Sequence, residues 1–137
     1  MELKNSALFK ENCLIGGKWI DSNTGEKINV DNPANGKIIG NVPKCSTSET
    51  TKAIDEAQTA FPLWRDKTAK ERSIILQKWA RLIEKNVDDL AKIMTVEQGK
   101  PLAEAKGEIL MGVTYIDFYA EEGKRVYGDI IPDPMPD

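Results

Sequence analysis

The sequence has no histidine and only two cysteines, Cys13 and Cys45. Histidine is the commonest general base and metal ligand near neutral pH. Its absence argues against a zinc site or a Cys-His catalytic pair within this chain. The two cysteines fit no metal-binding or redox spacing, and we expect both to be free thiols.

Long apolar runs and basic stripes are also missing. No stretch is long and apolar enough to cross a bilayer, and residues 1–12 carry charges throughout, without the apolar centre of a signal peptide. The 19 Lys and Arg residues are interspersed with 22 Asp and Glu residues. We therefore expect no membrane span, no nucleic-acid partner and a cytoplasmic location.

Turn signals divide the first third of the chain into short apolar stretches. Gly16 and Gly17 interrupt one such stretch and are typical of a hairpin turn. The NPANG run at residues 32–36 is a second strong turn signal, because proline fixes φ and Asn-Gly tolerates positive φ. These patterns predict a small antiparallel β meander, with strands at residues 14–15, 18–20, 27–30 and 38–42.

Helical periodicity replaces the strand pattern after residue 45, and we predict about four helices. Thr68 and Glu71 have the spacing of a capping box ahead of the clearest helix. Ser46 and Glu49 have the same spacing at the start of the first helix, although Ser48 is an equally good N-cap.

Other boundary signals come from proline, asparagine and glycine. Pro62 is expected to end or kink the first helix, and Asn86 can cap the third. Gly99 is a natural C-terminal residue for the third helix, and Pro101 fits the first turn of the fourth. Gly123 is expected to end the fourth helix.

The chain is therefore predicted to be a single α+β segment covering residues 1–137. The β meander occupies residues 1–45, the helical part residues 46–126, and an extended tail residues 127–137. From the residues alone, this describes a soluble strand-plus-helix domain without an assigned function.

Five sequence strings add a family resemblance. LIGGKW at residues 14–19 and NPANG at residues 32–36 resemble the start of the aldehyde dehydrogenase superfamily. Three further strings resemble its succinate-semialdehyde branch: TAKER at residues 68–72, EQGKPLAEAKGE at residues 97–108 and YAEEGKR at residues 119–125. The resemblance covers essentially the whole chain and implies the N-terminal part of the α/β aldehyde dehydrogenase fold, with helices that pack beside a cofactor-binding sheet.

The resemblance also implies an activity. A complete enzyme of this branch oxidises succinate semialdehyde to succinate with NAD or NADP: a cysteine thiolate attacks the aldehyde, a hydride passes to the nicotinamide, and glutamate-activated water hydrolyses the thioester. The family's nucleophile, general base, oxyanion asparagine and glycine-rich cofactor loop are expected beyond residue 137. We therefore expect this segment to be non-catalytic and to bind no nicotinamide cofactor by itself.

Expected partners follow from the same resemblance. They are the remainder of the same polypeptide, further copies in a homo-oligomer, and a small-molecule aldehyde in the full enzyme.

Two sets of site residues can be carried over by position. Val30 and Asp31 would supply main-chain oxygens, and Glu97 a carboxylate, to a monovalent cation such as sodium or potassium. Met111, together with Tyr115, would line the substrate tunnel, although ordinary core packing is an equally good interpretation of Met111.

Two other functions stay open. The full protein could oxidise another semialdehyde or betaine aldehyde, because the groups that bind the distal end of the substrate are expected downstream. Alternatively, the chain could be a free-standing, non-catalytic helical interaction module. A reading frame that continues to a cysteine nucleophile would support the enzyme, and a stop codon would support the module.

Overall fold

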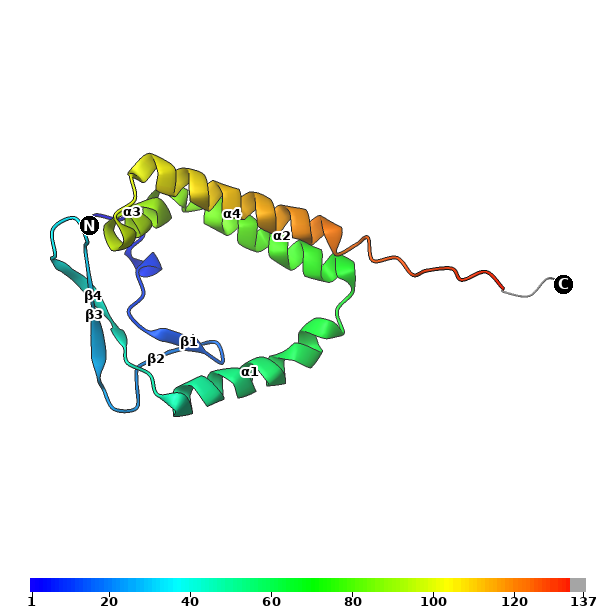
Figure 1. Ribbon diagram of the computed structural model, residues 1–137, viewed down its shortest axis with the longest axis horizontal. Helices are drawn as coiled ribbons and strands as arrows, with labels where there is room; N and C mark the ends of the chain where they lie inside the picture. The colour runs from blue at the N-terminus through cyan, green and yellow to red at the C-terminus, as the bar shows by residue number, and fades with distance from the viewer. Residues whose placement is uncertain (134–137) are drawn as a thin grey trace.

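The computed structural model describes residues 1–133 and places two β-hairpins before four helices (Figure 1). Residues 127–133 form neither helix nor strand; the rest of the predicted tail, residues 134–137, lies outside the described residues. The elements are, in chain order, a 3-10 turn η1 (Ser6–Leu8), β1 (Cys13–Ile15), β2 (Lys18–Ile20), β3 (Lys27–Asp31), β4 (Ile38–Pro43), α1 (Thr47–Arg65), α2 (Ala69–Lys85), α3 (Val87–Gln98) and α4 (Leu102–Glu122).

The strands pair as two separate antiparallel sheets of two strands each, β1 with β2 and β3 with β4. Gly16 and Gly17 form the first turn with φ values of 56° and 74°, a region that favours glycine. The connection from β2 to β3 bends toward α1, where the backbone N–H of Asn23 donates to Glu49 at 2.7 Å. This contact gives a physical reason why the predicted meander consists of two hairpins and not one continuous sheet.

Both predicted capping boxes are present. The Ser46 hydroxyl and Glu49 carboxylate cap α1, and Thr68 and Glu71 cap α2 in the same reciprocal way. Ser46, not Ser48, is therefore the N-cap of α1. Pro62 lies within the last turn of α1, and the helix continues to its end at Arg65.

Asn86 occupies the N-cap position of α3, as the sequence predicted, but its side chain makes no capping hydrogen bond. Its side-chain amide donates backward to the carbonyl of Leu82 at 2.8 Å, which helps to close α2. The carboxylate of Asp89, in the first turn of α3, accepts hydrogen bonds from the backbone N–H groups of Lys4 and Asn5, with N···O distances of 3.0 and 2.8 Å. The start of α3 therefore holds the N-terminal segment of the chain.

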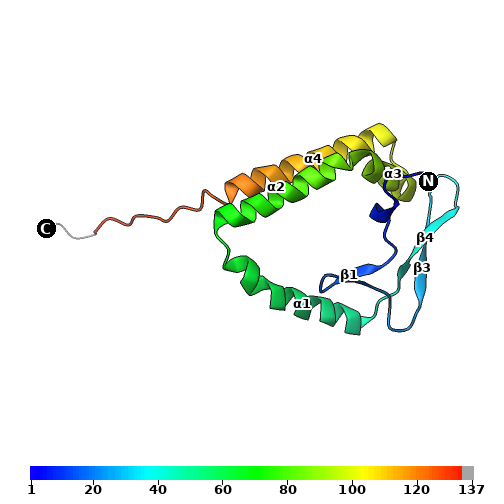
Figure 2. The same cartoon turned by 180° about the vertical axis from the view of Figure 1, so that it is seen from behind.

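The helical part is built on α2 and α4, which lie side by side along most of their length in both views (Figures 1 and 2). The buried apolar residues of the described chain are all small: Ala80, Ala91, Ala105, Val113 and Ala120. Side-chain size sets the distance between packed helices, so alanines permit close approach. The core is therefore a tight junction of α2, α3 and α4.

Many large apolar side chains lie outside this junction. Trp79 and Leu82 on α2 are 54% and 59% exposed, and Leu63 on α1 is 75% exposed. Exposed apolar surface on this scale marks an interaction face in soluble proteins. None of the helices in residues 1–133 is long and apolar enough to span a bilayer.

The exposed faces predict self-association of the isolated chain. Light scattering is expected to show dimers or larger species that grow with concentration from micromolar to millimolar. Leu82→Lys is expected to weaken this association, because it places a charge on the exposed apolar face of α2. Thr51→Lys, which adds the same charge at an exposed polar position of α1, serves as the control. A monomer mass across the whole range would contradict the prediction.

Candidate functional site

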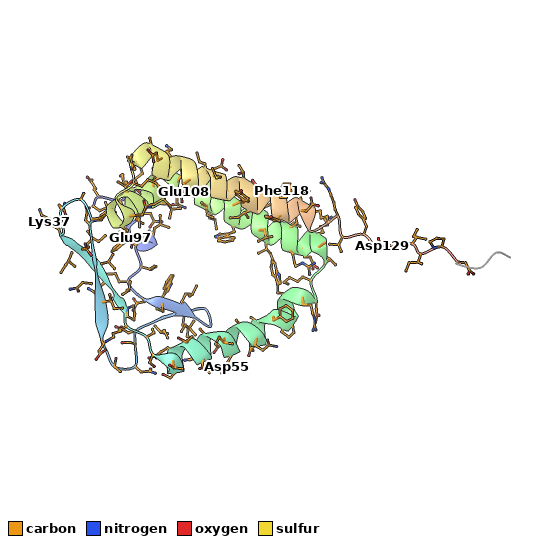
Figure 3. The ribbon with its side chains drawn as sticks, viewed as in Figure 1. Lys37, Asp55, Glu97, Glu108, Phe118 and Asp129 are labelled. Carbon is orange, nitrogen blue, oxygen red and sulfur yellow. The ribbon has the colours of Figure 1, made fainter. Side chains whose placement is uncertain are left out.

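The turn of the β3–β4 hairpin meets the turn between α3 and α4. Gly99 has a φ of +83°, and a Cβ placed there would lie 2.9 Å from Cγ of Pro33. Glu97 stands on the last turn of α3, two residues before this contact (Figure 3). The structure therefore brings the end of β3 and the end of α3 to one side of the molecule, as a site formed by Val30, Asp31 and Glu97 requires.

The β3 part of this site lies beside an irregularity in the sheet. Val30 pairs with Gly40 and Asp31 pairs with Ile38, so Ile39 is an extra residue on β4. A bulge of this kind interrupts the ladder and bends the strand that carries it. The irregularity therefore lies at the two residues whose main-chain oxygens are predicted to bind the cation.

Glu97 is exposed, and its carboxylate makes no hydrogen bond or ion pair with any other residue in the described range 1–133. Lys100, the nearest candidate partner in the sequence, instead pairs with Glu108 on α4. A carboxylate at a helix C-terminus faces the negative end of the helix dipole. A cation at this position would therefore remove an unfavourable interaction.

The donor set at this turn suits only one class of metal. Across residues 1–133 no group of three or more His, Cys, Asp or Glu side chains is placed to hold a metal ion. The predicted site is of a different kind, with two main-chain carbonyls and one carboxylate. Oxygen donors of this type favour a hard cation such as sodium or potassium, and the assignment of Val30, Asp31 and Glu97 stays a prediction.

An apolar groove of about 540 Å³ runs between α2, α3 and α4. Glu97 and Gln98 are its polar residues. Its other lining residues are Trp79, Ile83, Leu90, Ile93, Met94, Ile109, Gly112 and Ile116. The groove is therefore suited to apolar side chains and offers no set of groups for acid–base chemistry.

Met111 and Tyr115 lie one turn apart on α4 and are 58% and 59% exposed. Met111 is therefore not a core residue of the described chain. Tyr115 borders a separate hollow of about 360 Å³ with Thr114, Phe118 and Tyr119. Neither Met111 nor Tyr115 lines the apolar groove, so the structure does not bring the tunnel residues together with Glu97.

Sequence reasoning missed the full role of Glu49, the residue with the most strongly shifted carboxyl group. Its side chain is 3% exposed and accepts hydrogen bonds from the Ser46 hydroxyl and from the backbone N–H groups of Asn23 and Ser46. These bonds, the Ser46 hydroxyl first among them, lower the pKa of Glu49 to about 2. The capping-box spacing pointed to the local bonds, but the sequence contains no signal for the bond from Asn23.

Glu49 predicts a specific acid sensitivity. Its carboxyl pKa is lower in the folded chain than its ordinary value of 4.5, so its contribution to stability is complete above pH 4.5 and is lost as the pH falls to about 2. Glu49→Gln is expected to lower the melting temperature by several degrees at pH 7 and to flatten the curve of stability against pH in this window. Glu71, whose carboxyl pKa is also lowered by its cap, will leave some dependence in the variant.

Circular dichroism melts between pH 2 and pH 7 test this expectation, with the exposed residue Glu104 replaced by Gln as the control. Parallel stability curves for the wild-type and Glu49→Gln chains would contradict the role given to Glu49.

Comparison with known proteins identifies the family of the chain. Residues 19–137 match the model of the aldehyde dehydrogenase family. The chain belongs to this family. It is 55% identical to the NADP-dependent succinate-semialdehyde dehydrogenase of Escherichia coli strain K12 and 53% identical to the glutarate-semialdehyde dehydrogenase of Pseudomonas putida strain KT2440. Each match covers 100% of the chain and 28% of the relative.

The fold agrees with this family assignment. A crystal structure of an NADP-dependent enzyme from E. coli superposes on 98% of the chain with a TM-score of 0.95 and 54% sequence identity, and the match covers 28% of that enzyme. The hairpins and helices described above are therefore those of the matching portion of an aldehyde dehydrogenase. The chain spans about 28% of the length of the relatives it matches.

Proposed function

We propose that this chain is the N-terminal part of an NAD(P)-dependent dehydrogenase that oxidises succinate semialdehyde to succinate. The observation that carries the proposal is the match of the whole chain, at 55% identity, to a relative with that named activity. The small alanine core fits a supporting segment.

Glutarate semialdehyde is the second candidate substrate, because a relative named for it is 53% identical over the whole chain. The two aldehydes differ by one methylene, which a binding pocket distinguishes by roughly 10–200-fold. The test is to express the reading frame with any continuation beyond residue 137, and to compare kcat/KM for both aldehydes and for betaine aldehyde with NAD⁺ and NADP⁺. A preference for succinate semialdehyde of about tenfold or more supports the first candidate; a reversed order supports the second.

Within such an enzyme, we propose that the segment supports the cofactor-binding part and shapes the substrate tunnel. The exposed apolar faces of α2 and α4 support the first role. The exposure of Met111 and Tyr115 supports the role in the substrate tunnel, because both residues are more than half exposed in the described chain. Tyr115→Ala is expected to raise KM for the aldehyde several-fold without changing KM for the nicotinamide, whereas Leu110→Ala, on another side of α4, serves as the control.

We also propose a monovalent cation at Val30, Asp31 and Glu97. The contact of Pro33 with Gly99 and the unpaired Glu97 carboxylate support it. In the full-length protein, sodium or potassium is expected to raise the melting temperature relative to choline at equal ionic strength. Glu97→Gln is expected to abolish this increment, and Glu104→Gln to preserve it. An equal rise in melting temperature with the cation in both variants would show that Glu97 is not part of the site.

A further inference from the structure

The two cysteines, separated by 32 positions in the sequence, meet in the folded chain. Their sulfur atoms lie 3.7 Å apart, with the Cys45 thiol donating to Sγ of Cys13. Both side chains are partly exposed and both are free thiols. Cys13 opens β1, and Cys45 lies between β4 and the N-cap of α1, so the pair joins two parts of the fold that are distant in sequence.

We propose that Cys13 and Cys45 form a reversible disulfide by exchange with a low-molecular-weight disulfide such as glutathione disulfide. A disulfide bond is about 2.05 Å long, so the sulfurs need to approach each other by less than 2 Å. The chain has no other cysteine to compete for either sulfur. Partial exposure gives a small disulfide access to the pair.

The surroundings of Cys45 disfavour it as the first attacking sulfur. Burial and the bond with Cys13 raise the pKa of the Cys45 thiol, and the carboxylates of Glu49 and Asp21 add to this effect. A raised pKa keeps Cys45 in the thiol form, which is not the nucleophile in exchange. The first attack is therefore assigned to Cys13.

The exchange balances in two steps. The Cys13 thiolate attacks one sulfur of glutathione disulfide, forms a mixed disulfide and releases one glutathione thiolate. Cys45 then loses its proton to solvent and attacks the Cys13 sulfur, which releases the second glutathione. The two protein thiols lose two electrons in total, and glutathione disulfide gains them as two thiols.

The product would connect the β1–β2 hairpin covalently to the start of α1. The turn of this hairpin lies against α1, where Gly16 and Gly17 line a hollow together with Glu56 and Leu63. The crosslink would therefore restrain the hairpin and the start of α1, both of which lie outside the alanine core. Glutathione returns it to the dithiol.

The test titrates the chain with glutathione disulfide against a fixed concentration of glutathione, followed by acid quenching, alkylation and trypsin. Cleavage after lysine places Cys13 in residues 11–18 and Cys45 in residues 45–52. The expected product is these two peptides linked within one chain, two hydrogens lighter than their sum, and separated again by dithiothreitol. Half-conversion is expected at about tenfold less glutathione disulfide than mixed-disulfide formation in Cys13→Ser or Cys45→Ser.

A repeat in concentrated urea separates folded geometry from chance encounter in a flexible chain, and the advantage of about tenfold is expected to disappear there. The same peptide assay applies to the full-length protein. Three outcomes would overturn the proposal: glutathione adducts alone, a crosslink only between two chains, or an equal yield with and without urea.

Discussion

No NADH or NADPH above the enzyme-free blank is expected when the isolated chain is mixed with succinate semialdehyde and either nicotinamide. Aldehyde oxidation by this family needs a thiolate nucleophile, and nucleophilic cysteines have a lowered pKa. The pKa of Cys45 is raised, chiefly by burial and by its bond with Cys13. Nicotinamide absorbance at saturating aldehyde measures the outcome.

The control for this prediction is the full-length protein, which is expected to be active. Its Cys13→Ser/Cys45→Ser double variant is expected to keep that activity, because neither cysteine is assigned to the chemistry. Turnover by the isolated chain, in a preparation free of host dehydrogenases and abolished by the same double substitution, would contradict the assignment and place a nucleophile in this segment.

Gly99→Val is expected to destabilise the fold by about 2–4 kcal/mol, which is large against the total stability of a small domain. A φ of +83° is costly for any residue with a Cβ, and most costly for a β-branched one. The new Cβ would also lie 2.9 Å from Cγ of Pro33. The denaturation midpoint measures the loss.

Gly25 separates the two parts of this effect. Its φ is +71°, but nothing lies within 4 Å of a Cβ built there. Gly25→Ala therefore reports backbone strain alone, about 1–2 kcal/mol, and Gly99→Ala is expected to cost more. Pro33→Ala should relieve part of the extra cost in the Gly99→Ala background. Equal losses at Gly25 and Gly99, without relief, would show that the contact between the two turns has no energetic weight.

The features that the sequence predicted well are those whose partners are close in the chain. The capping boxes of Ser46 with Glu49 and of Thr68 with Glu71 each join residues three positions apart, so spacing alone identifies them. The left-handed conformation of Gly99 follows from the same local logic.

Long-range packing decided the features that the sequence left open. The Asn86 side chain could bond either to a carbonyl of α2 or to the free N–H groups at the start of α3. It donates to the carbonyl of Leu82 and makes no capping bond to α3. Asp89 finds its donors at Lys4 and Asn5, more than 80 positions away. Propensity and periodicity contain no information about such partners.

The candidate site shows the same division. Family resemblance, not spacing, placed Val30, Asp31 and Glu97 together, and the structure adds the contact between the two turns that this grouping requires. Trp79 and Leu82 lie on the apolar face of α2, and both are more than half exposed. Apolar periodicity predicts which face of a helix is to be covered, but not whether the covering surface belongs to the same 133 residues.

Alanine loses no rotamer freedom when it is buried, whereas a leucine or isoleucine side chain loses roughly 0.5–1 kcal/mol. The junction of α2, α3 and α4 closes over Ala80, Ala91, Ala105 and Ala120, so these helices can dock at little side-chain entropic cost. The exposed large apolar side chains on the outer faces of these helices keep their rotamer freedom until another surface packs against them. The ordering of these bulky side chains is thus left to the surface that covers them.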